Sequence, residues 1–100
     1  MKAVVLKSNK KLSFINKPLN DLENNHCRIK IQNVGLCSSD IQRSYGNGAY
    51  FYPLIMGHEI SGEISEIGSN ISNYSVGDRI TVFPLLPCFN CEPCEREMYA

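Results

Sequence analysis

The sequence lacks a net charge, a long apolar run and a recognisable export signal. Its 100 residues include ten basic and ten acidic side chains, so the formal charge at neutral pH is zero. Without a basic surplus, neither nucleic acid nor an anionic membrane is expected as the main partner. The longest apolar runs, residues 3–6 and the proline-interrupted residues 82–86, fall far short of the ~20 residues of a membrane span. Because the N-terminus has no apolar signal-peptide core, we expect a cytoplasmic protein.

A dinucleotide-binding fingerprint is also missing. The motif Gly-x-Gly-x-x-Gly needs three glycines at a strand-to-helix turn, but after Gly46 and Gly48 the third position is Phe51. A chain of 100 residues is also only long enough for one modest domain. We therefore predict no nicotinamide-binding unit within these residues.

Cysteine is present in an odd number, and three of the five cysteines are spaced by two residues: Cys88, Cys91 and Cys94. In a chain without an export signal, this spacing favours a metal site over disulfides. Two-residue spacers let successive thiolates turn onto one tetrahedral zinc ion. An iron–sulfur cluster is the alternative, although ferredoxin motifs continue with three residues and then Cys-Pro, where this chain has Met98 and Tyr99.

Short strands dominate the rest of the pattern. Residues 2–6 and 11–16 are predicted to form a hairpin, with a turn at Ser8 and Asn9. After His26, apolar and polar residues alternate to residue 32, which is typical of a half-buried strand, and the slip after residues 33–34 indicates a bulge or strand end. Further strands are predicted at residues 59–67 and 79–83. The expected fold is mainly β, as a small barrel or sandwich.

One short helix is expected, and several segments are expected to be loops. Ser38 or Ser39 is predicted to cap the helix, with Asp40 in its first turn, and residues 46–48 to end it. Residues 18–25, the aromatic residues 49–56 and residues 88–94 are predicted loops. The core is expected to contain Ile64, Ile67, Ile71 and Ile80, with Cys27 buried in its strand and His26 facing solvent.

Two further side chains are candidate metal ligands, Cys37 and His58. Alone, each signal is weak, because a single cysteine or histidine is more often structural than a ligand. Their neighbours strengthen it: Ser39 offers a hydroxyl that could pass a proton, and Asp40 and Glu59 offer carboxylates that could orient an imidazole.

Four segments together resemble the zinc-dependent medium-chain alcohol and polyol dehydrogenases. They are Gly-Leu-Cys-Ser-Ser-Asp at residues 35–40, Gly-His-Glu-Ile-Ser-Gly at residues 57–62, Val-Gly-Asp-Arg at residues 76–79, and the cysteine triplet. The resemblance implies that residues 1–100 form a GroES-like, partly open β-barrel with a zinc-binding loop. This would be an N-terminal catalytic domain cut before its end, followed by an NAD-binding Rossmann domain outside this chain.

The resemblance also implies roles for single residues. Cys37 and His58 would ligate a catalytic zinc ion, Ser39 would begin the proton relay, and Asp40 and Glu59 would lie beside the metal. A structural zinc ion would be held by Cys88, Cys91 and Cys94. The third catalytic ligand and the fourth structural cysteine are expected beyond residue 100. Many alcohol dehydrogenases have a relay histidine where this chain has Gln42, so water is expected to carry the proton out here.

The implied reaction is oxidation of a secondary hydroxyl group of a polyol or polyol phosphate with NAD. A zinc ion with three protein ligands keeps one position open for that hydroxyl group. Residues 47–53 and 84–89 are most similar to enzymes that oxidise galactitol 1-phosphate to tagatose 6-phosphate. Arg43 could contact a substrate phosphate, although a solvated arginine on a short helix is the simpler explanation. Tyr50 could line the cleft, and core or interdomain packing explains it equally well.

The resemblance implies a homodimer or homotetramer for the full-length protein. A sorbitol, threonine or simple alcohol dehydrogenase of the same family is an alternative. From a different functional class, a non-catalytic β-barrel that uses zinc to bind a partner is also compatible with the sequence. The 100 residues alone are predicted to be inactive, because they lack the cofactor fold, a third catalytic ligand and a fourth structural thiolate.

Overall fold

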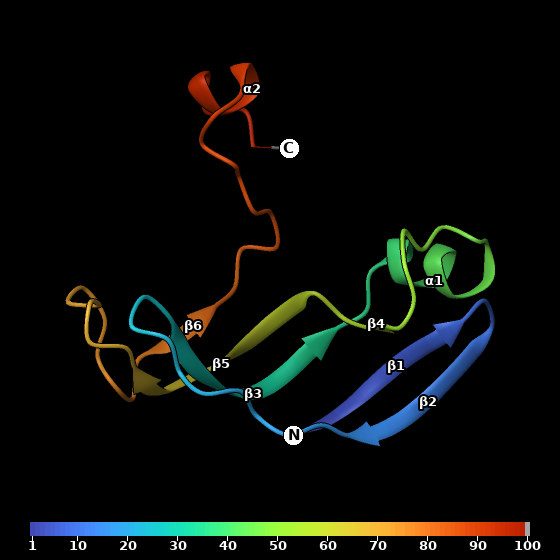
Figure 1. Ribbon diagram of the computed structural model, residues 1–100, viewed down its shortest axis with the longest axis horizontal. Helices are drawn as coiled ribbons and strands as arrows, with labels where there is room; N and C mark the ends of the chain where they lie inside the picture. Colours follow the sequence, from blue (N-terminus) through green and yellow to red (C-terminus); the bar gives the residue numbers. More distant parts are fainter. Residues whose placement is uncertain (100) are drawn as a thin grey trace.

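The computed structural model describes residues 1–99, which form two three-stranded antiparallel sheets and two short helices (Figure 1). The predicted mainly β class is confirmed. The strand order is β2-β1-β4 in the first sheet and β3-β5-β6 in the second. The first sheet contains β1 (Lys2–Ser8), β2 (Lys11–Asn16) and β4 (Leu54–Ile55); the second contains β3 (Cys27–Gly35), β5 (Glu59–Ile67) and β6 (Arg79–Thr81).

The β1 strand of the β1–β2 hairpin supplies three of the five buried hydrophobic side chains among the described residues. Ala3, Val5 and Leu6 of β1 are buried, and Leu6 is completely enclosed. The turn lies at residues 9–10, one residue later than predicted, because β1 continues to Ser8. At this turn the backbone N–H of Lys10 donates to the carbonyl of Ser44 at 2.8 Å, which ties the hairpin to the first helix.

The pairing of β3 with β5 determines where the candidate ligands meet. The strands run antiparallel from Cys27 opposite Ile67 to Gly35 opposite Glu59. The predicted irregularity lies earlier than expected: the register shifts between Arg28 and Ile29 and again between Ile31 and Asn33. Because β3 ends where β5 begins in space, the residues just after β3 and just before β5 are neighbours.

Helix α1 (Ser38–Tyr45) follows β3, but neither predicted serine caps it. Its N-cap is Cys37, whose backbone N–H donates to the Asp40 carboxylate at 3.0 Å. A carboxylate three residues into the helix can satisfy this donor without a capping hydroxyl. The sequence pattern does not show whether a serine or the residue before it is the N-cap. The helix ends at Gly46 as predicted, with the Gly46 N–H bonded to the Gln42 carbonyl at 2.7 Å.

The predicted loops contain two unpredicted elements. The short β4 lies within residues 49–56 and pairs with β1, so Ile55 lies opposite Val5. Helix α2 (Glu92–Glu95) begins inside the predicted loop of residues 88–94 and ends one residue after it. It lies at the end of an extended segment that leads away from both sheets (Figure 1). Strand β6 ends at Thr81 rather than at residue 83. Two- to four-residue elements depend on their partners more than on periodicity, so the sequence pattern does not reveal them.

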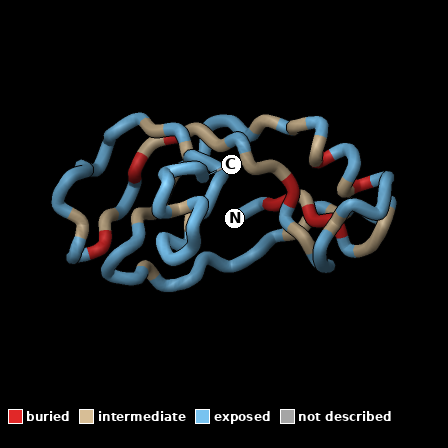
Figure 2. The backbone as a smooth tube through the Cα atoms, turned by 90° about the horizontal axis from the view of Figure 1, so that it is seen from above, coloured by how far each residue is buried: buried red, intermediate tan, exposed pale blue. Residues whose placement is uncertain are grey.

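The buried core is smaller than predicted. Ile64 is 3% exposed, but the three other isoleucines expected in the core, Ile67, Ile71 and Ile80, are only half-buried, as is Cys27. Figure 2 shows short buried stretches rather than one continuous core. Two narrow sheets of this size cannot enclose every apolar side chain that faces inward. Within residues 1–99, no helix is both long enough and apolar enough to cross a membrane.

Candidate metal centres and substrate cleft

The first candidate centre joins the end of β3 to the start of β5. One ligand atom each of Cys37, His58 and Glu59 lies within 4.8 Å of the other two. Cys37 follows β3 by two residues, and His58 directly precedes Glu59, the first residue of β5. The antiparallel pairing of Gly35 with Glu59 therefore brings these side chains together although 21 residues separate Cys37 from His58 in the sequence.

Two glycines allow the chain segments to approach this closely. A Cβ atom at Gly35 would collide with the Glu59 carboxylate. Gly57 has φ +89°, a conformation that side chains disfavour, and a Cβ atom there would collide with the Val34 side chain. At either position, a residue larger than glycine would therefore force a neighbouring side chain to move.

Asp40 connects the cluster to helix α1. Its side chain is 5% exposed, and its Oδ2 atom lies 3.3 Å from His58 Nδ1 and accepts the Cys37 backbone N–H at 3.0 Å. An acceptor at Nδ1 fixes the imidazole tautomer and leaves the other ring nitrogen available to a metal ion. The predicted neighbourhood of Asp40 and His58 is thus present as a direct contact.

The surroundings of Cys37 favour a thiolate. The backbone amide of Ser39, followed by the Ser39 and Ser38 hydroxyl groups, lowers the pKa of Cys37 to about 7, and His58 contributes in the same direction. The thiolate is the form that binds metal, so this environment suits a ligand. Ser39 is itself held by Arg43, whose Nη1 atom donates to Ser39 Oγ at 3.2 Å.

The second candidate centre is formed by Cys88, Cys91 and Cys94, whose sulfur atoms all lie within 4.8 Å of one another. The Sγ atoms of Cys88 and Cys94 are 3.8 Å apart. Two sulfurs bound at 2.3 Å to one tetrahedral zinc ion would be about 3.8 Å apart, so the spacing fits that geometry. Helix α2 begins after Cys91 and carries Cys94 back towards the other two thiols.

Mutual contacts shift the thiol pKa values of this group in opposite directions. For Cys91, the backbone amide of Cys94 acts to lower the pKa, but the thiols of Cys88 and Cys94 raise it overall. For Cys94, burial acts to raise the pKa, but hydrogen bonds with Cys91, Cys88 and nearby backbone amides lower it overall.

A cleft of about 680 Å³ opens beside the first centre. Asp40, Arg43 and His58 provide its polar wall, and aromatic and aliphatic side chains, including Tyr50, provide the rest. Tyr50 is 89% exposed, and Arg43 is the one cationic side chain among the described lining residues. The sequence-predicted substrate contacts, Arg43 and Tyr50, thus both border the space next to the candidate ligands.

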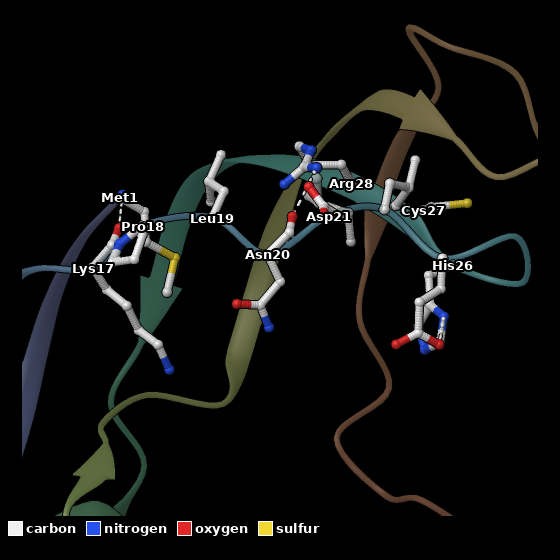
Figure 3. A pocket seen from close by; sticks show the side chains of 12 residues that line it. Met1, Lys17, Pro18, Leu19, Asn20, Asp21, His26, Cys27 and Arg28 are labelled. Atoms are coloured by element: carbon white, nitrogen blue, oxygen red, sulfur yellow. Dashed lines mark hydrogen bonds and ion pairs between the residues drawn. The ribbon is translucent and has the colours of Figure 1, made fainter.

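A second cleft of about 390 Å³ is lined by the loop between β2 and β3 and by the first residues of β3 (Figure 3). Arg28 stabilises this region: its Nη2 atom donates to the Asn20 carbonyl at 3.1 Å, and its Nε atom lies 2.8 Å from the Glu66 carboxylate. None of the predicted metal ligands is among the described residues that line this cleft.

Both donor sets fit zinc. Thiolate, imidazole and carboxylate are the ligands of catalytic zinc sites, and clustered thiolates are those of structural sites. Cys37 and His58 are the candidate holders of the first ion, with Glu59 as the third donor present in this chain. The carboxylate of Glu59, which the sequence predicted to lie beside the metal, is within 4.8 Å of the Cys37 and His58 ligand atoms.

The comparison with known families is decisive here: the profile of the alcohol dehydrogenase GroES-like domain matches residues 23–100. The chain belongs to this zinc-dependent alcohol dehydrogenase family. Within the alcohol dehydrogenase family, galactitol 1-phosphate 5-dehydrogenase of Escherichia coli is 45% identical over 73 residues, which make up 73% of this chain and 21% of that enzyme. Sorbitol dehydrogenase of Bacillus subtilis is 35% identical over 103 residues, covering 99% of this chain and 29% of that enzyme.

A solved structure supports the same assignment. The crystal structure of galactitol-1-phosphate dehydrogenase from Escherichia coli matches with a TM-score of 0.91 and 37% identity, covering 99% of this chain and 29% of that chain. The GroES-like fold predicted for this alcohol dehydrogenase family member is confirmed. The chain spans less than a third of the length of these relatives.

Sequence reasoning missed two features of the centre. It did not find the contact of Arg43 with Ser39, although their spacing of four residues places them on one helix face. It also did not find Cys37 as the N-cap of α1. An acidic residue three positions after Cys37 was the available signal for that cap.

Proposed function

We propose that this chain is the N-terminal catalytic part of a zinc- and NAD-dependent dehydrogenase that oxidises a secondary hydroxyl group of a polyol or polyol phosphate. The observation that carries the proposal is the meeting of Cys37, His58 and Glu59 donor atoms within 4.8 Å, with His58 at the wall of the 680 Å³ cleft. A metal centre that borders a cleft can reach a substrate, whereas a structural centre needs no such opening.

Each residue of the centre has a separate role in the proposed reaction. When bound, zinc supplies Lewis-acid polarisation of the substrate hydroxyl group. Asp40 holds His58 in one orientation through Nδ1. The Ser39 hydroxyl group is the proposed first acceptor of the substrate proton and passes it outwards through water. NAD is the hydride acceptor, and this chain contributes the orientation of the substrate.

The proposed domain plan is a GroES-like catalytic domain over residues 1–100, interrupted before its end, with the NAD-binding Rossmann domain elsewhere in the protein. The surface supports this plan. The chain exposes 7967 Å², whereas a compact monomer of its mass exposes about 5,700 Å². Phe14 and Leu86 are 87% and 95% exposed. Apolar surface of this extent is expected to be covered by the rest of the protein or by a partner copy, consistent with the proposed homodimer or homotetramer.

Galactitol 1-phosphate, oxidised to tagatose 6-phosphate, is the proposed substrate. The similarity to galactitol 1-phosphate 5-dehydrogenase supports it. A cationic Arg43 in the cleft wall is compatible with a phosphate group, and Tyr50 is the proposed neighbour of the carbon chain. Sorbitol is the second candidate, supported by the 35% identity with sorbitol dehydrogenase over almost the whole chain.

A substrate comparison with the full-length protein tests the proposal. Initial rates are measured with galactitol 1-phosphate, galactitol, sorbitol and a simple alcohol, each with NAD and with NADP, after zinc has been quantified. We expect the highest kcat/KM for galactitol 1-phosphate with NAD. A preference for sorbitol would transfer the assignment to the second candidate, and zinc-loaded protein without turnover on any of these compounds would overturn the dehydrogenase proposal.

A further inference from the structure

We infer that Arg43 is a positioning residue that holds the Ser39 hydroxyl group and the Asp40 carboxylate in the arrangement needed for zinc retention and proton transfer. Its contribution to zinc retention follows from the geometry alone, whereas its contribution to turnover rests on the proposed function. Arg43 would act through the neighbouring Ser39 and Asp40 side chains, so this role requires no contact between Arg43 and the substrate.

Helix α1 places the three side chains on one face. Arg43 follows Ser39 by four residues and Asp40 by three, which are the spacings of helix neighbours. Its Nη1 atom donates to Ser39 Oγ at 3.2 Å and lies 3.7 Å from Asp40 Oδ1. The Arg43 side chain is 29% exposed, so its contacts with Ser39 and Asp40 are partly shielded from water. Arg43 also borders the cleft.

Because Asp40 is buried, its ion pair with Arg43 matters for keeping the Asp40 carboxylate in place. A carboxylate that is 5% exposed is costly unless cations or hydrogen-bond donors compensate it. Oδ2 faces Cys37 N–H and His58 Nδ1, and Oδ1 faces Arg43. Among the ion pairs of Asp40 within residues 1–99, Arg43 supplies the permanently charged partner. Without it, Asp40 would be held on one side only, and its hold on His58 would loosen.

The hydrogen bond to Ser39 sets the direction of a proton relay. A guanidinium group can only donate, so Ser39 Oγ must use a lone pair to accept from Arg43. The hydroxyl proton is then directed away from Arg43, and the second lone pair remains available for a proton from the cleft. An uncharged side chain at position 43 would leave the hydroxyl group free to rotate, and the relay would lose its fixed starting geometry.

Zinc retention by the full-length protein is the first test. A chelator is titrated into three zinc-loaded proteins: wild type, Arg43→Met and Arg43→Lys. A Cys37→Ser variant, which should lose the zinc ion bound by Cys37 and His58, shows which part of the titration belongs to that site. Removing a residue that supports a metal ligand commonly lowers affinity 10- to 100-fold; because Arg43 acts through Asp40, we expect a loss of roughly threefold to tenfold for Arg43→Met. Arg43→Lys keeps the charge and should retain more zinc.

Arg28→Met is the matched control for loss of a paired arginine. Arg28, like Arg43, contacts a carboxylate and one further acceptor, here a backbone carbonyl, but it lies beside the other cleft. We expect wild-type zinc retention for this variant. If Arg43→Met folds with a wild-type melting curve and retains zinc as well as wild type does, the inference is overturned. If it melts early, the titration is repeated at a temperature at which Arg43→Met and Arg43→Lys are both folded, and equal zinc loss from these two variants would overturn the inference.

Turnover separates positioning from phosphate contact. If Arg43 positions Ser39, Arg43→Met should lower kcat about tenfold on both galactitol 1-phosphate and unphosphorylated galactitol, as expected when a general acid–base group loses its alignment. A rise in KM confined to the phosphorylated substrate would overturn the positioning role in turnover. Absence of turnover in the wild type would refute the proposed function, while the chelator titration would still decide the role of Arg43.

Discussion

At the level of single residues, two glycines with positive φ angles differ in the cost that a side chain would have there. One position would suffer backbone strain alone, and the other would suffer backbone strain and a steric collision. Gly57 (φ +89°) and Gly77 (φ +96°) both adopt the left-handed region. A Cβ atom at Gly77 would meet nothing within 4 Å, whereas one at Gly57 would collide with Val34. The same substitution therefore tests two different costs in one chain.

Gly57→Ala is predicted to destabilise the full-length protein more than Gly77→Ala. The left-handed conformation costs an alanine about 1–2 kcal/mol, and overpacking against Val34 adds about 1–3 kcal/mol. Urea unfolding of both variants measures the difference. Because Gly57 directly precedes His58, we also expect zinc loss only in Gly57→Ala. Equal losses of stability in the two variants would contradict the collision predicted at Gly57.

The pH dependence of cysteine modification provides a second prediction at this level. The pKa of Cys37 is lowered to about 7, chiefly by the Ser39 backbone amide, while that of Cys91 is raised by the neighbouring thiols. Alkylation requires the thiolate, which is present above the pKa and lost as the pH falls through it. In zinc-free full-length protein, we expect half-maximal modification of Cys37 near pH 7 and of Cys91 only at higher pH, measured by peptide mass analysis. A Cys91 that reacts first as the pH is raised would contradict this order.

At the level of secondary-structure elements, helix α1 and strands β3 and β5 form the functional unit. The strands fix the distance between Cys37 and His58, and the helix supplies Asp40, Ser39 and Arg43 from its first two turns. Rigid elements hold a site more accurately than loops do. The junction between β3 and α1 is therefore the point at which a change should affect both folding and metal binding.

Asp40→Asn tests that junction, with Asp78→Asn as its control. Both aspartates accept the backbone N–H of the residue three positions earlier, Asp40 from Cys37 at 3.0 Å and Asp78 from Ser75 at 2.8 Å. Asp40 is buried against His58, whereas Asp78 is exposed in a turn. Asparagine should cost about 1–3 kcal/mol at position 40 and less at position 78, because only Asp40 is itself buried and contacts partly buried partners.

Zinc binding should separate these two variants more strongly than stability does. Loss of the Asp40 contact with His58 is expected to reduce zinc affinity roughly 10- to 100-fold, and Asp78→Asn should leave it unchanged. Chelator competition and urea unfolding of the full-length protein provide the two measurements. Wild-type zinc affinity in Asp40→Asn would show that Asp40 does not orient His58.

At the level of the whole molecule, the open surface and the separate metal centres are the main features. The radius of gyration is 15.6 Å, compared with about 13 Å for a compact domain of 100 residues. The segment after β6 carries the cysteine triplet away from both sheets (Figure 1). The two candidate centres therefore belong to different parts of the molecule.

The 100-residue chain alone is predicted to catalyse no NAD reduction. No Gly-x-Gly-x-x-Gly fingerprint occurs in its sequence, and the remaining ligands of both zinc sites are expected outside it. Absorbance of NADH is measured with the purified, zinc-supplemented chain and the polyols used for the full-length protein. Measurable reduction of NAD by any of them would refute this prediction.

Much of the fold could be predicted because its signals are local. The limits of β5 and the end of α1 at Gly46 agree with the prediction, since alternation and glycine act within a few residues. Burial was predicted less well: Ile67 and Ile80 occupy suitable strand positions but lie only half-buried. Whether an inward-facing side chain is covered depends on a second layer, and periodicity along one strand contains no information about that layer.

The sequence by itself determined the mainly β class, the family and the identity of the candidate ligands, because residue types and short spacings carry that information. Only the tertiary structure decided that the Glu59 carboxylate joins Cys37 and His58 and that Asp40 contacts His58 directly. The pairing of Gly35 with Glu59 brings Cys37 to His58 across a long sequence separation, and it also brings Asp40 of α1 to His58. Such contacts arise from strand register and side-chain direction, which are set by the packing of the whole chain.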